Sequence, residues 1–181
     1  MRDWFDGYWQ QHHMERRLAG LSRWHRAAFA AATAEHALAE YRPGLCSEAQ
    51  ADELRRHLNE LWEAIDRHSR EPDNLDRAIT ALESAEYSDG ASLVVNAHKT
   101  VYYHMPEFAI DVANDAYHAA QRIAFGRLGA MDEHEALLRE MNTNIVNECL
   151  AFQDGLLVAL ETLPSSLVAR QYVNEALNER A

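Results

Sequence analysis

Residues 106–125 read PEFAIDVANDAYHAAQRIAF, and this stretch is apolar over most of its circumference when it is drawn as a helix. Its apolar residues recur at three- and four-residue spacing, the period of an α-helix, and leave only a narrow polar strip. A helix that is apolar nearly all round packs at the centre of a fold. The stretch therefore predicts a central helix that the rest of the chain surrounds.

The same period continues in both directions along the 181 residues, and we find no two-residue alternation typical of strands. Gly (7) and Pro (4) are rare enough to mark the ends of helices. The pattern predicts one all-α, bundle-like domain of about seven or eight helices over residues 1–181. We place these helices at about residues 3–17, 18–41, 47–70, 74–86, 88–104, 106–125, 132–164 and 165–179.

The chain carries 29 Asp and Glu against 17 Lys and Arg, a formal net charge of −12. Most of the excess lies in residues 71–181, which hold 18 acidic and 7 basic residues. Nucleic-acid affinity depends on neutralising phosphates with Lys and Arg, so we expect no nucleic-acid partner. An acidic surface suits a basic protein partner, although acidity also serves solubility alone.

Several further features indicate a cytoplasmic protein. Cys46 and Cys149 form no metal-type pair and are expected to be reduced and structural. The N-terminus has no positively charged segment followed by an apolar run, as a secretion signal would. No stretch approaches 18 consecutive apolar residues, so we expect no membrane association.

Two tryptophan-anchored segments carry a family resemblance. They are Leu21-x2-Trp24-x4-Phe29-x5-Glu35 and Arg55-Arg56-x-Leu58-x3-Trp62-Glu63. Together they resemble the YjaG-like family of bacterial all-helical proteins, a domain of unknown function. Ala109-Ile110-Asp111 looks like that family's central segment, and weaker similarity surrounds Glu148 and Gln153. The resemblance covers a core of residues 15–163, between an aromatic extension (1–14) and a C-terminal helix (165–180). It implies a soluble helical fold and no assigned chemistry.

The sharpest polar constellation is Asp111, Asp115, His118 and Arg122, whose spacing places all four on one strip of the central helix. The two carboxylates and the imidazole could hold a divalent cation, with His98 or Glu148 completing the shell. They could instead act as an acid/base group, with Arg122 binding an anionic substrate. The simpler alternative is that the strip is the solvated side of the helix. No cofactor is required by any recognised motif.

Two other groups of residues are candidates for binding. Glu35 falls on the apolar stripe of its helix, where a carboxylate needs partners, so we expect a salt bridge with Arg55 or Arg56. Its functional alternative is a carboxylate in a pocket. His98 lies on the apolar stripe of its helix and is expected to be a hydrogen-bonded core residue. The aromatic residues Trp4, Phe5, Tyr8 and Trp9 either dock a partner or pack back onto their own domain.

These observations leave three functional hypotheses. The first is a non-enzymatic acidic protein that binds or inhibits a basic partner, of the adaptor or immunity type. The second is a metal- or ligand-dependent helical-bundle enzyme that uses Asp111, Asp115 and His118. The third is a structural homodimer whose interface buries the N-terminal aromatic residues. We favour the first, because no recognised catalytic signature requires the second.

Overall fold

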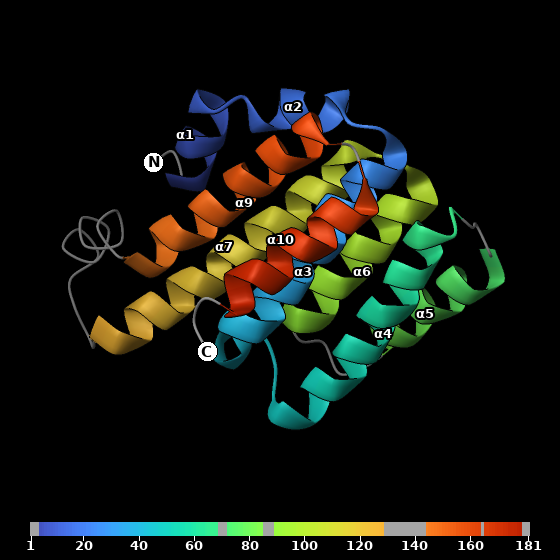
Figure 1. Ribbon diagram of the computed structural model, residues 1–181. Coiled ribbons are helices and arrows are strands. Elements are labelled where there is room, and N and C mark those ends of the chain that lie inside the picture. The colour runs from blue at the N-terminus through green and yellow to red at the C-terminus, as the bar shows by residue number, and fades with distance from the viewer. Residues whose placement is uncertain (1–3, 69–71, 85–88, 129–143, 164, 179–181) are drawn as a thin grey trace.

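The computed structural model describes residues 4–68, 72–84, 89–128, 144–163 and 165–178 (Figure 1). All regular structure in these residues is helical, which confirms the predicted all-α class. The helices are α1 (Trp4–Gln11), α2 (Met14–Gly20), α3 (Arg23–Glu40), η1 (Arg42–Gly44), α4 (Glu48–Asp66), α5 (Pro72–Ser84), α6 (Asp89–Tyr103), α7 (Pro106–Leu128), α9 (Asn144–Thr162) and α10 (Ser166–Asn178).

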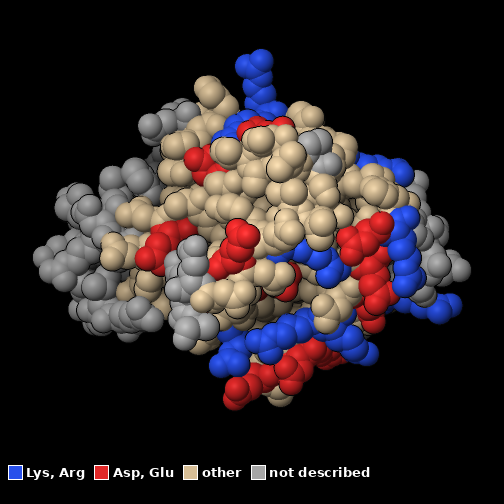
Figure 2. Space-filling model, in the orientation of Figure 1, with Lys and Arg blue, Asp and Glu red and all other residues tan. Residues whose placement is uncertain are grey.

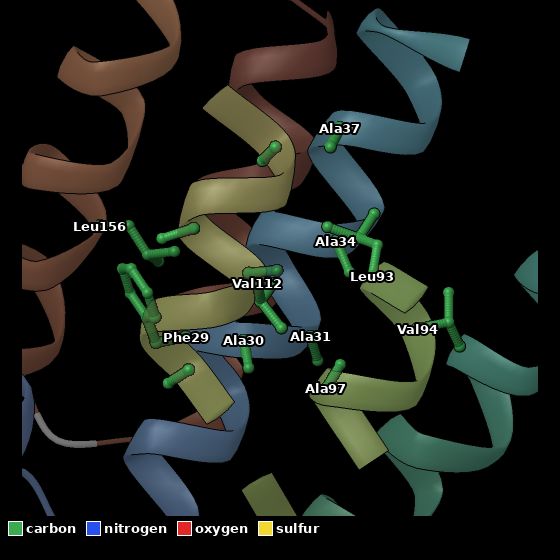
Figure 3. Close-up of a cluster of buried hydrophobic side chains, with 14 of the residues drawn as sticks. Phe29, Ala30, Ala31, Ala34, Ala37, Leu93, Val94, Ala97, Val112 and Leu156 are labelled. Atoms are coloured by element: carbon green, nitrogen blue, oxygen red, sulfur yellow. The ribbon is translucent and has the colours of Figure 1, made fainter. Parts of the chain in front are cut away.

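The predicted central helix, α7, packs against α3 and α6, and these three helices form the middle of the molecule (Figure 1). Their contact is lined by small side chains, most of them alanines of α3. We call Ala30, Ala31, Ala34 and Ala37 of α3 with Ala97 of α6 the alanine seam; all five are completely buried (Figure 3). Small side chains let helix axes approach closely, because the side chains at the contact set the interaxial distance.

The other helices pack around this centre. Helix α4 packs on α3 and α6, and α5 packs on α6. Helix α9 packs on α7, and α10 packs on both α3 and α9 (Figure 1). The fully buried Gln153 of α9 donates a hydrogen bond of 3.0 Å to the carbonyl of Ala113 on α7, which ties the two helices together. Within the described ranges, no helix has the length and apolar character needed to cross a lipid bilayer.

Several predicted helix ends agree with the structure. Ser47, at the predicted start of the third helix, caps α4, since its hydroxyl accepts from the Gln50 amide while Gln50 accepts from the Ser47 amide. Pro106 begins α7 rather than kinking a longer helix. The predicted start of the seventh helix, near Asp132, lies outside the described residues.

The prediction for residues 3–41 is wrong in two places. The first predicted helix is divided into α1 and α2 at His13, which adopts a left-handed conformation with φ of 53°. The second begins at Arg23 instead of residue 18, because Ser22 is extended and accepts a hydrogen bond from the His25 amide as an N-cap. The apolar period continues across both breaks, so periodicity alone did not reveal them.

Candidate functional site

The polar strip of α7 faces α6 over part of its length instead of lying wholly in solvent. Asp115 is half-buried, and its Oδ2 accepts hydrogen bonds from Ser92 Oγ and Asn96 Nδ2 of α6, both at 3.3 Å. His118 is also half-buried, with its Nδ1 2.9 Å from Oε1 of Gln121. Asp111, one turn before Asp115, is exposed. The strip is therefore an interhelical seam at one end and open surface at the other.

Arg122, the last residue of the strip, holds three elements together. Its Nε donates to the carbonyl oxygen of Gly44 at 2.9 Å, and a terminal nitrogen pairs with Asp89 at 2.9 Å. A Cβ at Gly44 would lie only 2.9 Å from the carbonyl oxygen of Ala119, so η1 approaches α7 more closely than a larger residue allows. Arg122 thus braces η1 and α6 against α7, and its predicted role of binding an anionic substrate stays a prediction.

Three carboxylates in successive turns of α7 form what we call the acidic strip: Glu107, Asp111 and Asp115. Burial and the charge of Glu107 raise the pKa of Asp111 above its ordinary value. Burial likewise raises the pKa of Asp115. Its two hydrogen bonds lower this pKa, and the charges of Asp111 and Asp89 raise it further, so that the net shift is upward. The carboxylates of the acidic strip therefore repel one another, and a bound cation would relieve the repulsion.

The structure does not complete the predicted metal shell. His98 is fully buried and faces α4, where its Nε2 lies 3.0 Å from the carbonyl oxygen of His57. Burial lowers the pKa of His98 to about 4, so the imidazole is neutral and donates through Nε2. The other predicted ligand, Glu148, is exposed on α9. Across the described parts of the chain, no three His, Cys, Asp or Glu side chains gather closely enough to hold a metal ion.

Glu35 has a different partner from the one predicted. Its Oε2 accepts a hydrogen bond of 2.8 Å from the indole nitrogen of Trp62 on α4. Arg55 and Arg56 instead pair with Asp52 and Glu53 along the exposed side of α4. The arginines are one helical turn from these acids, so local pairs form without bringing long side chains across to α3. Glu35 does line a pocket, together with Arg55.

An exposed apolar surface adjoins the acidic strip, and the sequence analysis missed it. We call it the aromatic corner: Tyr102, Tyr103, Met105 and Phe108, at the turn from α6 to α7. Tyr103 and Met105 are 51% and 46% exposed, and the Tyr103 ring lies 5.5 Å from that of Phe108. Arg26 of α3 supports the turn by donating to the His104 carbonyl at 3.1 Å. A signal was present, since three aromatic residues and a methionine flank the predicted helix end at Pro106.

The N-terminal aromatic residues that the structure describes pack back onto the domain. Trp9 is 2% exposed and belongs to the core, while the Tyr8 ring stacks on His12 at 4.1 Å. Arg17 of α2 pairs with Asp154 and Glu161 of α9, which fixes the N-terminal helices across one end of the bundle. The side chains of Trp4 and Phe5 lie outside what the structure describes.

Charge is distributed unevenly on the view of Figure 2, where acidic and basic groups form alternating bands around a broad uncharged area. Neither thiol is poised as a nucleophile, since burial raises the pKa of Cys149 to about 12 and also raises that of Cys46.

Comparison of the chain with protein-family models, curated proteins and solved structures finds no match in any of the three. The case for function therefore rests on the residues themselves.

Proposed function

We propose that this chain is a non-enzymatic protein that binds a basic protein partner on the surface formed by the acidic strip and the aromatic corner. The observation that carries the proposal is their adjacency: Glu107 lies between Met105 and Phe108 in the sequence and begins the strip. Exposed aromatic and methionine side chains beside a row of carboxylates make a surface with both an apolar centre and a charged rim.

The energetics favour such a partner. Aromatic anchors supply most of the affinity at many interfaces, while complementary charge steers encounter and selects the partner. Burial and, after it, the charge of Glu107 raise the pKa of Asp111, and a Lys or Arg placed beside this carboxylate would oppose both effects. The partner we expect is therefore a protein segment that combines apolar residues with Lys or Arg. An inhibitor or immunity role is the form of this function that we infer from the sequence, and membership of the YjaG-like family stays a prediction.

The test compares capture by immobilised variants of equal net charge. The double variant Glu107→Gln/Asp111→Asn removes two charges from the strip, and Asp52→Asn/Glu53→Gln removes two exposed charges from α4. We expect one basic protein to be retained from lysate at low ionic strength by the wild type and the α4 variant, and lost by the strip variant. Raising the salt concentration should release it, because screening weakens exposed charge pairs. Equal recovery by both variants would contradict the proposal.

The two alternatives predict different results. A metal-dependent bundle enzyme predicts that divalent cations raise the melting temperature and that Asp111→Asn or His118→Ala abolishes the rise. Native mass spectrometry of the untagged protein would show any retained metal or ligand as added mass. A homodimer built on the N-terminal aromatic residues predicts that removing residues 1–10 halves the mass in solution. The burial of Trp9 within its own domain leaves less apolar surface for that interface.

A further inference from the structure

A small pocket of about 170 Å³ lies between α3, α4 and α10, away from the contacts that define the acidic strip and the aromatic corner. Its polar lining comes from two helices, with a carboxylate on α3 and a guanidinium and an amide on α4. Apolar side chains from all three helices complete it. The residues that matter here are Glu35, Leu38, Arg55, Leu58, Asn59 and Leu177.

The Glu35 carboxylate is held in a fixed orientation. Trp62 is 2% exposed, and the guanidinium of Arg170 lies over its ring at 4.8 Å. The indole N–H of Trp62 donates to Oε2 of Glu35 at 2.8 Å. One oxygen of Glu35 is thus bound, and the other retains its capacity to accept hydrogen bonds. A carboxylate oriented in this way is a preorganised acceptor for a cationic ligand group.

The residues of α4 that line the pocket supply hydrogen-bond donors. Arg55 and Asn59 are four residues apart on α4, so their side chains stand one turn apart on the same side of the helix. One terminal nitrogen of Arg55 donates to Asp52 at 3.2 Å, which leaves the rest of its five-donor fork for another acceptor. Arg55 makes its ion pair with Asp52, and Glu35 makes its hydrogen bond with Trp62. Both charged groups line the pocket, and each contacts a residue outside the pocket lining.

We propose that this pocket binds a free apolar amino acid as its zwitterion. The ligand's ammonium group donates to Glu35, its carboxylate accepts from Arg55 and Asn59, and its side chain contacts Leu38, Leu58 and Leu177. Guanidinium groups match carboxylates in geometry as well as charge. Pockets for drug-sized ligands have volumes of roughly 300–1,000 Å³, so this pocket suits a molecule of smaller size. The site is independent of the proposed binding of a basic protein.

Isothermal titration calorimetry of the full-length protein tests the proposal with leucine, valine and methionine as probes. We expect a saturable heat for at least one of them. Isoamylamine lacks the carboxylate of leucine and isocaproate lacks its ammonium group, so each should bind at least about tenfold more weakly than leucine. Absence of heat from all three amino acids at millimolar concentration would overturn the proposal. The proposal would also be overturned if either analogue bound as tightly as leucine, because either Glu35 or Arg55 would then contribute nothing to binding.

Variants locate the site. Glu35→Gln retains an oxygen that can accept from Trp62, so the fold should persist while amino-acid affinity falls about tenfold. Arg55→Gln changes an exposed side chain and should produce a similar loss, which keeps the test valid if Glu35→Gln fails to fold. The matched control is Glu63→Gln, which removes an exposed carboxylate elsewhere on α4 and should leave the affinity unchanged. Unchanged affinity in Arg55→Gln would overturn the assignment, whatever the strip variants do to protein binding.

Discussion

One side of α7 presents Val112, Ala113 and Ala116, which are no more than 1% exposed, while the other presents Glu107, Asp111 and Asp115. The buried side packs tightly against α3 and α6 and determines where the helix lies. The acidic strip brings like charges together in successive turns, where burial and the neighbouring charges raise the pKa values of Asp111 and Asp115. The same helix thus stabilises the fold on one side and opposes it slightly on the other.

This difference is informative because like charges four residues apart destabilise a helix and contribute nothing to packing. If stability alone determined the sequence of α7, a neutral residue would serve at Asp111. Retaining three carboxylates beside an exposed aromatic corner is what a binding surface requires. The predictions below test whether the two sides of α7, and the interior as a whole, differ in this way.

The largest loss of stability should come from placing an aspartate, the residue type of the acidic strip, in the interior. Ala31→Asp puts a carboxylate into the completely buried alanine seam, among the hydrophobic side chains drawn in Figure 3. An unpaired buried charge costs roughly 3–5 kcal/mol, so urea unfolding should show a loss of this size. Ala151→Asp on the exposed side of α9 is the matched control and should change stability by about 0.5 kcal/mol or less. Similar losses in both variants would remove the distinction between seam and surface.

The pH dependence of stability should also distinguish the interior, where His98 is buried, from the acidic strip. The pKa of His98 is lowered from 6.5 to about 4, so between these values the unfolded chain binds a proton that the folded chain does not. Stability contributed by neutral His98 is therefore lost as the pH falls from about 6.5 to about 4, by about 3 kcal/mol. The difference in unfolding free energy between wild type and His98→Gln should change by that amount over this window. A difference independent of pH would show that His98 titrates normally.

The sequence predicted the parts of the fold in which buried side chains recur with the period of a helix. The broad apolar stretch of α7 predicted the central helix, because side chains that face a core recur every three or four residues. The breaks at His13 and Ser22 depend on single backbone conformations and a hydroxyl cap. A glycine would have predicted a left-handed backbone conformation at this position, whereas a histidine does not.

The site was less predictable, because its contacts join residues far apart in the chain. Spacing correctly placed Asp111, Asp115, His118 and Arg122 on one helix, yet it could not show that Arg122 binds the carbonyl of Gly44. Nor could it choose Trp62 over Arg55 as the partner of Glu35, since both lie on the helix that packs against α3. Pairing across helices is decided by rotation and distance, which a single sequence does not contain.

Arg122 should behave as part of the scaffold although it lies on the strip. Arg122→Met removes its bonds to Asp89 and Gly44, and we expect a loss of about 1 kcal/mol, since the side chain is 44% exposed and solvent screens the ion pair. Capture of the basic partner should persist at a temperature where the variant is folded. Loss of capture by a folded Arg122→Met protein would place this residue in the binding surface.

The smallest effect is the most specific, because its sign is opposite to that of most substitutions. Asp111→Asn removes repulsion from Glu107 and Asp115, so the free energy of unfolding should rise by about 0.2–0.5 kcal/mol at neutral pH. Protonation of Asp111 relieves the same repulsion in the wild type, so the gain should be lost as the pH falls through the raised pKa of this carboxylate. Asp52→Asn, which breaks a pair with Arg55, should show no such gain. A neutral-pH loss in Asp111→Asn would mean that a cation already neutralises this carboxylate, and the repulsion that supports the proposed partner would not exist.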